Sequence, residues 1–201
     1  MSCSSLLEMK ATIFQTIFAK NQPVPITVPQ ALQRIREGRS RTTVESVRLG
    51  NKEDKLKLPA VLFSGEFSSR HDDDIHEHSG FIVLDFDHVE VETTKKALAT
   101  DDFIYACWVS PSGTGIKALV RVSSPERHRD HFRALMRYFD ERYGLELDSS
   151  GINESRACFE SYDPELFQNQ LCEKFSMLLS EEGLNAKPEA PTLSHTDYGK
   201  L

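Results

Sequence analysis

Phe81-Ile82-Val83-Leu84-Asp85-Phe86-Asp87 is the most apolar run of the chain, and it predicts a strand that ends in two aspartates. Successive side chains of a strand point to opposite faces, so the two carboxylates are expected to lie on one face and the apolar residues between them on the core face. Two like charges a few ångströms apart resist joint ionisation unless a cation lies between them or one pKa rises. The pair therefore predicts a divalent metal site, and hard oxygen ligands favour Mg²⁺ or Mn²⁺ over zinc. The alternative is a strand that ends at a solvated acidic loop.

The composition is that of a globular chain with one main domain. The 201 residues are 39% hydrophobic and 27% charged, which is enough for one substantial core but short for two. No apolar stretch approaches the roughly 18 residues of a membrane span, and residues 1–8 lack a secretory signal pattern. We therefore expect a cytoplasmic protein without a membrane partner.

The charge of the chain limits how it can meet nucleic acid. A net charge of -7 argues against a protein that coats nucleic acid by charge alone. Residues 34–57 nevertheless carry eight Lys and Arg against four Asp and Glu. Such a stretch fits either a surface that faces a polyanion or an ordinary solvated helix and loop.

The order of predicted elements favours an α+β fold with a mixed, largely antiparallel sheet packed with helices. Residues 183–201 are poor in bulky apolar side chains and predict a flexible tail or linker behind a domain of residues 1–182, as in the front piece of a longer protein. The polar segment 70–78 reads as a solvated loop rather than a metal site. Strands are predicted over residues 11–18, 58–63, 104–109, 116–122 and 156–160, and helices over 29–37, from Ser124 to Gly144, and over 163–179.

Three further segments carry residues suited to phosphate chemistry. In the strand 116–122 the even positions are apolar, while Lys117 and Arg121 lie on the other face. The preceding turn is glycine-rich and can expose backbone N–H groups as a phosphate-binding nest, although a plain hairpin turn is an equal alternative. Asp148 follows a short apolar run and by itself reads as a turn residue. The glycine-rich turn before the strand 116–122 consists of Ser112, Gly113, Thr114 and Gly115.

Taken together, these segments resemble the catalytic core of the archaeo-eukaryotic primase superfamily, the primase-polymerases. Three other segments are similar to the VirE N-terminal domain family, which is placed in that superfamily and is often found in front of helicase-like domains. These segments are Leu58–Phe67, His78-Ser79-Gly80 and Asn153–Phe159 with Ser161–Pro164. The resemblance covers roughly residues 11–179.

The resemblance implies an RRM-like catalytic core and a nucleotidyltransferase of a mobile element or phage. It would join nucleoside triphosphates on a single-stranded DNA template with Mg²⁺ or Mn²⁺, with a helicase domain as partner. Asp85, Asp87 and Asp148 would be the metal-binding catalytic acids. The turn residues Ser112 to Gly115, with Lys117 and Arg156, would contact the nucleotide. Lys117 stands where the superfamily usually has a histidine, a departure that bears on polymerase activity.

Two other functions fit the same residues. A catalytically degenerate module would bind nucleotide or template, or tether a helicase, without chemistry. A metal-dependent nuclease would use the same acids to cleave phosphodiesters, and it would shorten a labelled strand where a polymerase lengthens it.

Overall fold

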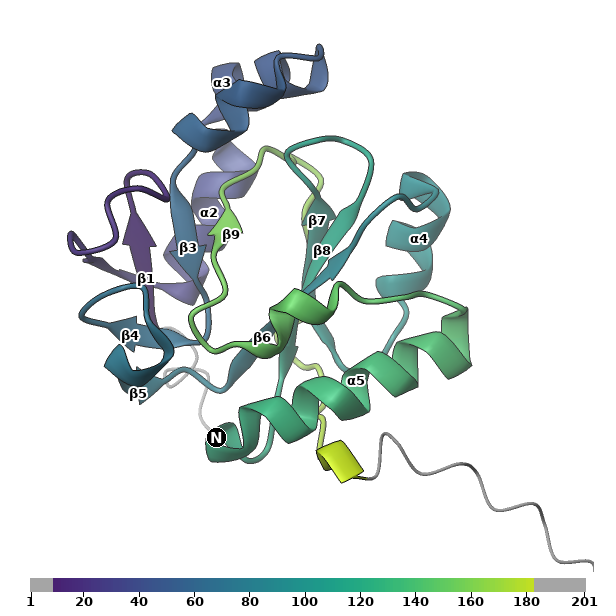
Figure 1. The fold of residues 1–201 in the computed structure, drawn as a ribbon. Coiled ribbons are helices and arrows are strands. Elements are labelled where there is room, and N and C mark those ends of the chain that lie inside the picture. The colour runs from purple at the N-terminus through teal and green to yellow at the C-terminus, as the bar shows by residue number, and fades with distance from the viewer. Residues whose placement is uncertain (1–8, 183–201) are drawn as a thin grey trace, which may run out of the picture.

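The computed structural model describes residues 9–182, and the predicted tail, 183–201, lies outside the described residues. Two four-stranded antiparallel sheets stand side by side, with helices around them, so the α+β expectation is confirmed (Figure 1). The first sheet has the order β2-β1-β3-β9, the second β10-β7-β8-β6, and β4 and β5 form a hairpin. The strands are β1 (Lys10–Phe14), β2 (Val24–Thr27), β3 (Ala60–Leu62), β4 (Gly65–Phe67), β5 (Ile75–His78), β6 (Phe81–Phe86), β7 (Ile104–Val109), β8 (Ile116–Arg121), β9 (Cys158–Phe159) and β10 (Phe167–Gln168).

The helices expected at 29–37 and from Ser124 to Gly144 are confirmed as α2 and α5, whereas sequence analysis does not predict α3 or α4. Thr27 caps α2 in a reciprocal pair with Gln30, and glycines in the left-handed conformation end α2 and α5, at Gly38 and Gly144. Ser124 makes no capping hydrogen bond, so α5 begins only after a 3-10 turn. The helices are α2 (Val28–Glu37), α3 (Arg41–Arg48), α4 (Val91–Leu98) and α5 (His128–Tyr143), with 3-10 segments η1 (Lys52–Lys57), η2 (Asp72–Asp74), η3 (Pro125–Arg127) and η4 (Ser149–Ile152).

The second sheet is buried on both faces. Ile82, Leu84 and Phe86 pack with Phe132, Leu135 and Phe139 of α5, as the alternation predicts. The opposite face, with Phe81, Val83 and Trp108, packs against α2 and the first sheet. The expectation of an open face that offers Lys117 and Arg121 is therefore wrong, since both side chains are buried. The first sheet covers what the alternation of a single strand presents as a solvent face.

The predicted last helix, 163–179, is wrong. The carboxylate of Asp163 accepts hydrogen bonds from Lys95 (2.6 Å) and from the backbone N–H of Val109 (2.9 Å), so it holds the chain against β7 and α4. The chain then runs extended, pairing β10 with β7 and burying Phe175 beside β8. Leu171, which the helical spacing places in the core, is 92% exposed. Tertiary pairing with a sheet edge overrides the helical spacing here.

Other boundaries differ less. The strands expected at 11–18, 58–63 and 156–160 are confirmed but shorter, as β1, β3 and β9. The segment 70–78, expected to be a polar loop, contains η2 and β5, and β5 pairs with β4. Among residues 9–182, no helix has the length and apolar character needed to cross a membrane.

Candidate functional site: an acidic triad beside two cations

The three predicted acids come together at one end of β6. Asp85 is in the strand, Asp87 follows its last residue, and Asp148 directly precedes η4. One carboxylate oxygen from each lies within 4.8 Å of the others. In the part of the chain that the structure describes, this is the one group of three His, Cys, Asp or Glu side chains whose ligand atoms come so close. The gathering of the acids is confirmed, although they are some sixty positions apart in sequence.

Asp148 is held by its own turn and by the strand. Its backbone N–H donates to the carbonyl of Asp85 (3.1 Å), and its carboxylate accepts from the N–H (2.9 Å) and hydroxyl (2.6 Å) of Ser150. A Cβ on Gly151 would lie 2.7 Å from the ring of Phe132, so glycine is what allows η4 to lie against α5. The third acid is thus fixed by local turn chemistry and by packing against α5.

Lys117 forms an ion pair with Asp85 across the sheet. The two residues are antiparallel partners in β8 and β6, and Lys117 Nζ donates to Asp85 Oδ2. Their side chains are only 8% and 15% exposed. Burial works against the charged form of Lys117, but the negative charge of Asp85 and the hydrogen bond to it act in the opposite direction, and the pKa of Lys117 lies above its ordinary value. Lys117 is therefore a fixed cation among the acids.

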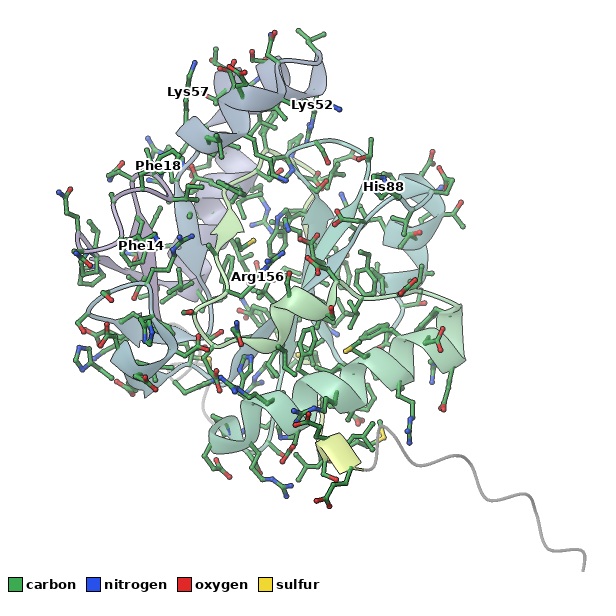
Figure 2. All side chains as sticks on the ribbon, in the orientation of Figure 1. Phe14, Phe18, Lys52, Lys57, His88 and Arg156 are labelled. Atoms are coloured by element: carbon green, nitrogen blue, oxygen red, sulfur yellow. The ribbon has the colours of Figure 1, made fainter. Side chains whose placement is uncertain are left out.

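Arg156 supplies a second cation. Its guanidinium donates to Asp148 (2.7 Å) and lies 3.9 Å from Asp85. Figure 2 shows Arg156 in the middle of the molecule, between β9 and the helix turn of η4. Burial alone would raise the pKa of Asp148, but hydrogen bonds from Ser150 and the charge of Arg156 outweigh it and lower that pKa below its usual value. Asp148 therefore stays ionised at neutral pH.

The glycine-rich turn touches the triad at Gly115. A Cβ there would lie 2.6 Å from the carbonyl oxygen of Phe86 and 3.3 Å from Asp87 Oδ1. The rest of the turn bonds to itself: Ser112 Oγ lies 2.9 Å from Ser110 Oγ and 3.1 Å from Thr114 Oγ1, and the N–H of Gly113 donates to the carbonyl of Ser110. The phosphate contacts expected of Ser112, Gly113, Thr114 and Gly115 stay predictions.

Gly115→Ala is expected to damage the triad. The new methyl group must displace the backbone of Phe86, at an expected stability cost of about 1–3 kcal/mol, and it moves the carboxylate of Asp87. We expect Mn²⁺ affinity, measured by isothermal titration calorimetry, to fall about tenfold or more. Ser112→Ala in the same turn is the control and should bind Mn²⁺ as the parent does. Equal Mn²⁺ affinity in Gly115→Ala and the parent would contradict this prediction.

A cavity of about 360 Å³ opens beside Asp85, and sequence analysis did not single out most of its residues. Lys55, Arg70 and Arg156 line it together with the ring of Phe159. Of these, Lys55 belongs to the basic stretch 34–57, whose other cations are largely engaged elsewhere: Arg34 with Glu160 (2.5 Å), Lys57 with Asp54 (2.6 Å), and Arg48 with backbone carbonyls. The sequence does not distinguish Lys55 from the other Lys and Arg residues of this stretch. Only the folded structure shows that Lys55 faces the cavity.

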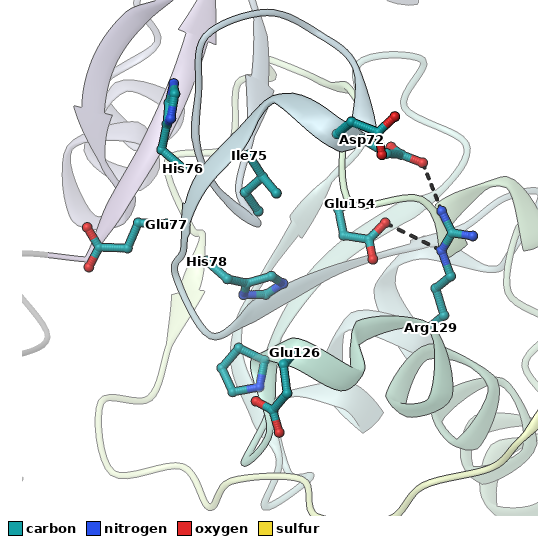
Figure 3. Close-up of a pocket in the computed structure, with 10 residues that line it drawn as sticks. Asp72, Ile75, His76, Glu77, His78, Glu126, Arg129 and Glu154 are labelled. Atoms are coloured by element: carbon teal, nitrogen blue, oxygen red, sulfur yellow. Dashed lines mark hydrogen bonds and ion pairs between the residues drawn. The ribbon is translucent and has the colours of Figure 1, made fainter.

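A second cavity, of about 280 Å³, lies between β5 and the start of α5. In Figure 3, Arg129 reaches two acids that line it, Asp72 (3.1 Å) and Glu154 (3.5 Å). His78 forms part of the wall. Asp72 and Glu154 thus already have a cationic partner, and the ion pair of Asp72 with Arg129 connects the segment between β4 and β5 to α5.

His78 also forms a buried pair with His128. Gly80 N–H donates to His78 Nδ1 (2.9 Å), so His78 Nε2 carries the proton that is shared with His128 Nδ1 at 2.9 Å. Burial lowers the pKa of His78 to about 4 and that of His128 to about 3. Both rings are therefore neutral in the folded protein near pH 7.

The histidine pair predicts a loss of stability in mild acid. In the unfolded chain a histidine binds its proton below about pH 6.5, whereas the folded chain resists protonation until about pH 4. The free energy of unfolding should therefore fall, by roughly 3 kcal/mol for each histidine, as the pH drops through this window. Urea denaturation at several pH values measures it. In a His78→Asn/His128→Leu variant, where Asn can still accept from Gly80 N–H, this part of the dependence should vanish; an unchanged slope would refute the assignment.

Comparison with known proteins gives one result. The family model of the BT4734-like N-terminal domain matches residues 53–167, and no curated protein or solved structure matches the chain. The resemblance to the VirE N-terminal domain family and the primase superfamily is corrected by this match, which is to a different family. The matched segment contains all three acids, Lys117 and Arg156. Because the match spans more than half of the 201 residues, the chain belongs to the BT4734-like N-terminal domain family.

Proposed function

We propose that this domain is a divalent-metal-dependent nucleotidyltransferase that joins nucleotides on a single-stranded DNA template. The observation that carries the proposal is the triad: three carboxylates within 4.8 Å, contributed by a strand, its end and a distant turn. The backbone hydrogen bond from Asp148 N–H to the carbonyl of Asp85 holds two of these acids close together. A solvated acidic loop has no need of such a bond.

The donor set fits Mg²⁺ or Mn²⁺. All three side chains offer carboxylate oxygens, which hard cations prefer, and none offers nitrogen or sulfur. Lys117 and Arg156 balance two of the three negative charges, so the cluster keeps one net negative charge for a cation. Asp85, Asp87 and Asp148 would hold the ion. When bound, it would lower the pKa of an attacking hydroxyl and neutralise charge on the phosphates.

The protein's own cations position the carboxylates of the triad. Lys117 fixes the carboxylate of Asp85, and Arg156 fixes that of Asp148, so two of the three acids are preorganised before any substrate arrives. Asp87 is exposed, so its carboxylate is accessible from solvent. Holding the reacting groups in line is the main contribution such a site makes.

Several finer expectations stay predictions under this proposal. They are the RRM-like arrangement of the catalytic core, the nucleotide contacts of the turn 112–115, a helicase partner, a place in a mobile element or phage, and a cytoplasmic location. Lys117 is predicted to contact nucleotide, yet its ammonium group is buried against Asp85, which favours a role in organising the acids.

The test is a product assay. The purified chain is incubated with Mn²⁺ or Mg²⁺, a single-stranded DNA template, and labelled ribo- or deoxyribonucleoside triphosphates. Template-dependent lengthening supports the proposal, and shortening of the strand identifies a nuclease instead. No change in any strand would refute nucleotidyl transfer.

One observation favours a second candidate, a degenerate module that binds nucleotide or template without chemistry. The ion pair of Lys117 with Asp85 ties up one of the acids that would hold the metal. Under this function the chain binds Mn²⁺ and nucleotide but yields no phosphodiester product, so the same assay and a binding titration separate the two.

A further inference from the structure

The cavity beside Asp85 joins a positive wall to the negative triad. Three cations line it, Lys55 from η1, Arg70 from the loop after β4, and Arg156 from the turn before β9, whereas Asp85 is the one carboxylate in its lining. This charge balance is opposite to that of the whole chain, which has a net charge of -7. A cavity of this kind attracts an anion and guides it toward the acids.

Two of these cations are available for a ligand. Within residues 9–182, neither Lys55 nor Arg70 has a carboxylate within ion-pair distance, in contrast to Lys57, which pairs with Asp54. Lys55 Nζ lies over the ring of Phe159 at 5.4 Å from its centroid. Both cations are partly buried, so they are less well hydrated than freely exposed side chains.

The remaining wall is suited to an uncharged, flat group. Phe159, Ile17 and Ala157 line it with apolar surface, and Asn153 and Ser155 add hydrogen-bonding groups. A ligand that suits this cavity therefore combines several negative charges with an aromatic ring. The volume of about 360 Å³ lies in the range of small-molecule sites and suits one nucleotide better than a strand.

We infer that this cavity is the binding site for an incoming nucleoside triphosphate. Its phosphates contact Lys55 and Arg70, its base lies along Phe159, and the phosphate nearest the sugar faces Asp85. This inference rests on the proposed function and adds to it the direction of substrate entry: the nucleotide arrives from the side of the first sheet, and not through the turn 112–115, whose hydroxyls bond to one another.

The test is nucleotide binding to a Lys55→Gln/Arg70→Gln variant. ATP and dATP are titrated calorimetrically with Ca²⁺ present to prevent turnover. Losing two charge-assisted contacts should weaken binding about 100-fold, while Mn²⁺ binding and the thermal midpoint stay as in the parent. Lys52→Gln/Lys57→Gln, which removes the same charge from exposed positions of η1, is the matched control and should bind both nucleotides normally.

Two further measurements make the outcome decisive. Phe159→Ala should weaken ATP more than inorganic tripolyphosphate, because only ATP carries a base to stack. A single-stranded oligonucleotide is titrated in parallel. Unchanged ATP and dATP binding in the Lys55→Gln/Arg70→Gln variant would overturn the inference, as would loss of oligonucleotide binding alone. An absence of product from the parent protein would contradict the proposed function. That result is distinct from unchanged nucleotide binding in the variant, which would contradict the inference about the cavity.

Discussion

Asp87→Asn is expected to abolish nucleotidyl transfer while leaving the fold intact. Asp87 is exposed and makes no ion pair among the described residues, so its charge contributes little to stability, within about 0.5 kcal/mol. As a member of the triad, its loss should remove several kcal/mol of charge stabilisation, which corresponds to a rate loss of about 1,000-fold or more. Product formation and urea denaturation measure the two effects.

Glu141→Gln is the matched control for this prediction. It removes one exposed acid of α5 that is not a member of the triad, and should leave the rate unchanged. Product formation by Asp87→Asn at the parent rate would reject a catalytic triad. Asp85→Ala with Asp87→Ala, the obvious double variant from the sequence, is a poorer test, because it leaves the buried Lys117 without its partner.

Lys117→Met is expected to destabilise the protein by about 3 kcal/mol. The lysine and Asp85 are both almost fully buried, and removing one member of a buried ion pair leaves the other charge uncompensated. Arg156, 3.9 Å from Asp85, replaces only part of the lost attraction. Urea denaturation without metal measures the effect.

Metal provides the second half of this test. A divalent cation bound by the triad supplies the missing positive charge, so added Mn²⁺ should stabilise Lys117→Met more than it stabilises the parent. The double variant Lys117→Met with Asp85→Asn removes both charges and should recover part of the lost stability. The effects of substitutions at two residues in contact are not additive, because the second removes the charge that the first left unpaired. A loss below about 1 kcal/mol in Lys117→Met would show that the pair is not buried in solution.

The same ion pair explains why Lys117 differs from its predicted role. The sequence places the lysine on a strand face that alternation presents as open, where an ammonium can reach a phosphate. In the folded chain the first sheet and α2 cover that face, and the side chain donates to the carboxylate of Asp85. A long flexible cation thereby becomes a fixed part of the acidic cluster.

Local sequence determined the elements whose signals are short-range. The alternation of Phe81 to Asp87 determined β6 and put Asp85 and Asp87 at its end, and capping by Thr27 and termination at Gly38 determined α2. Turn chemistry determined the conformation of Asp148, whose carboxylate accepts from Ser150 two residues on. These interactions lie within a few residues, so the sequence is sufficient to predict them.

Tertiary structure decided what depends on distant partners. Residues 163–179 have helical spacing but lie extended, because β7 offers an unpaired edge and Asp163 is held by Lys95 and Val109. The approach of Asp148 to Asp85, the burial of Lys117, and the assembly of Lys55, Arg70 and Arg156 around one cavity likewise join segments far apart in the chain. A residue pattern records which side chains share a face, but which surface covers that face is set only when the two sheets pack together.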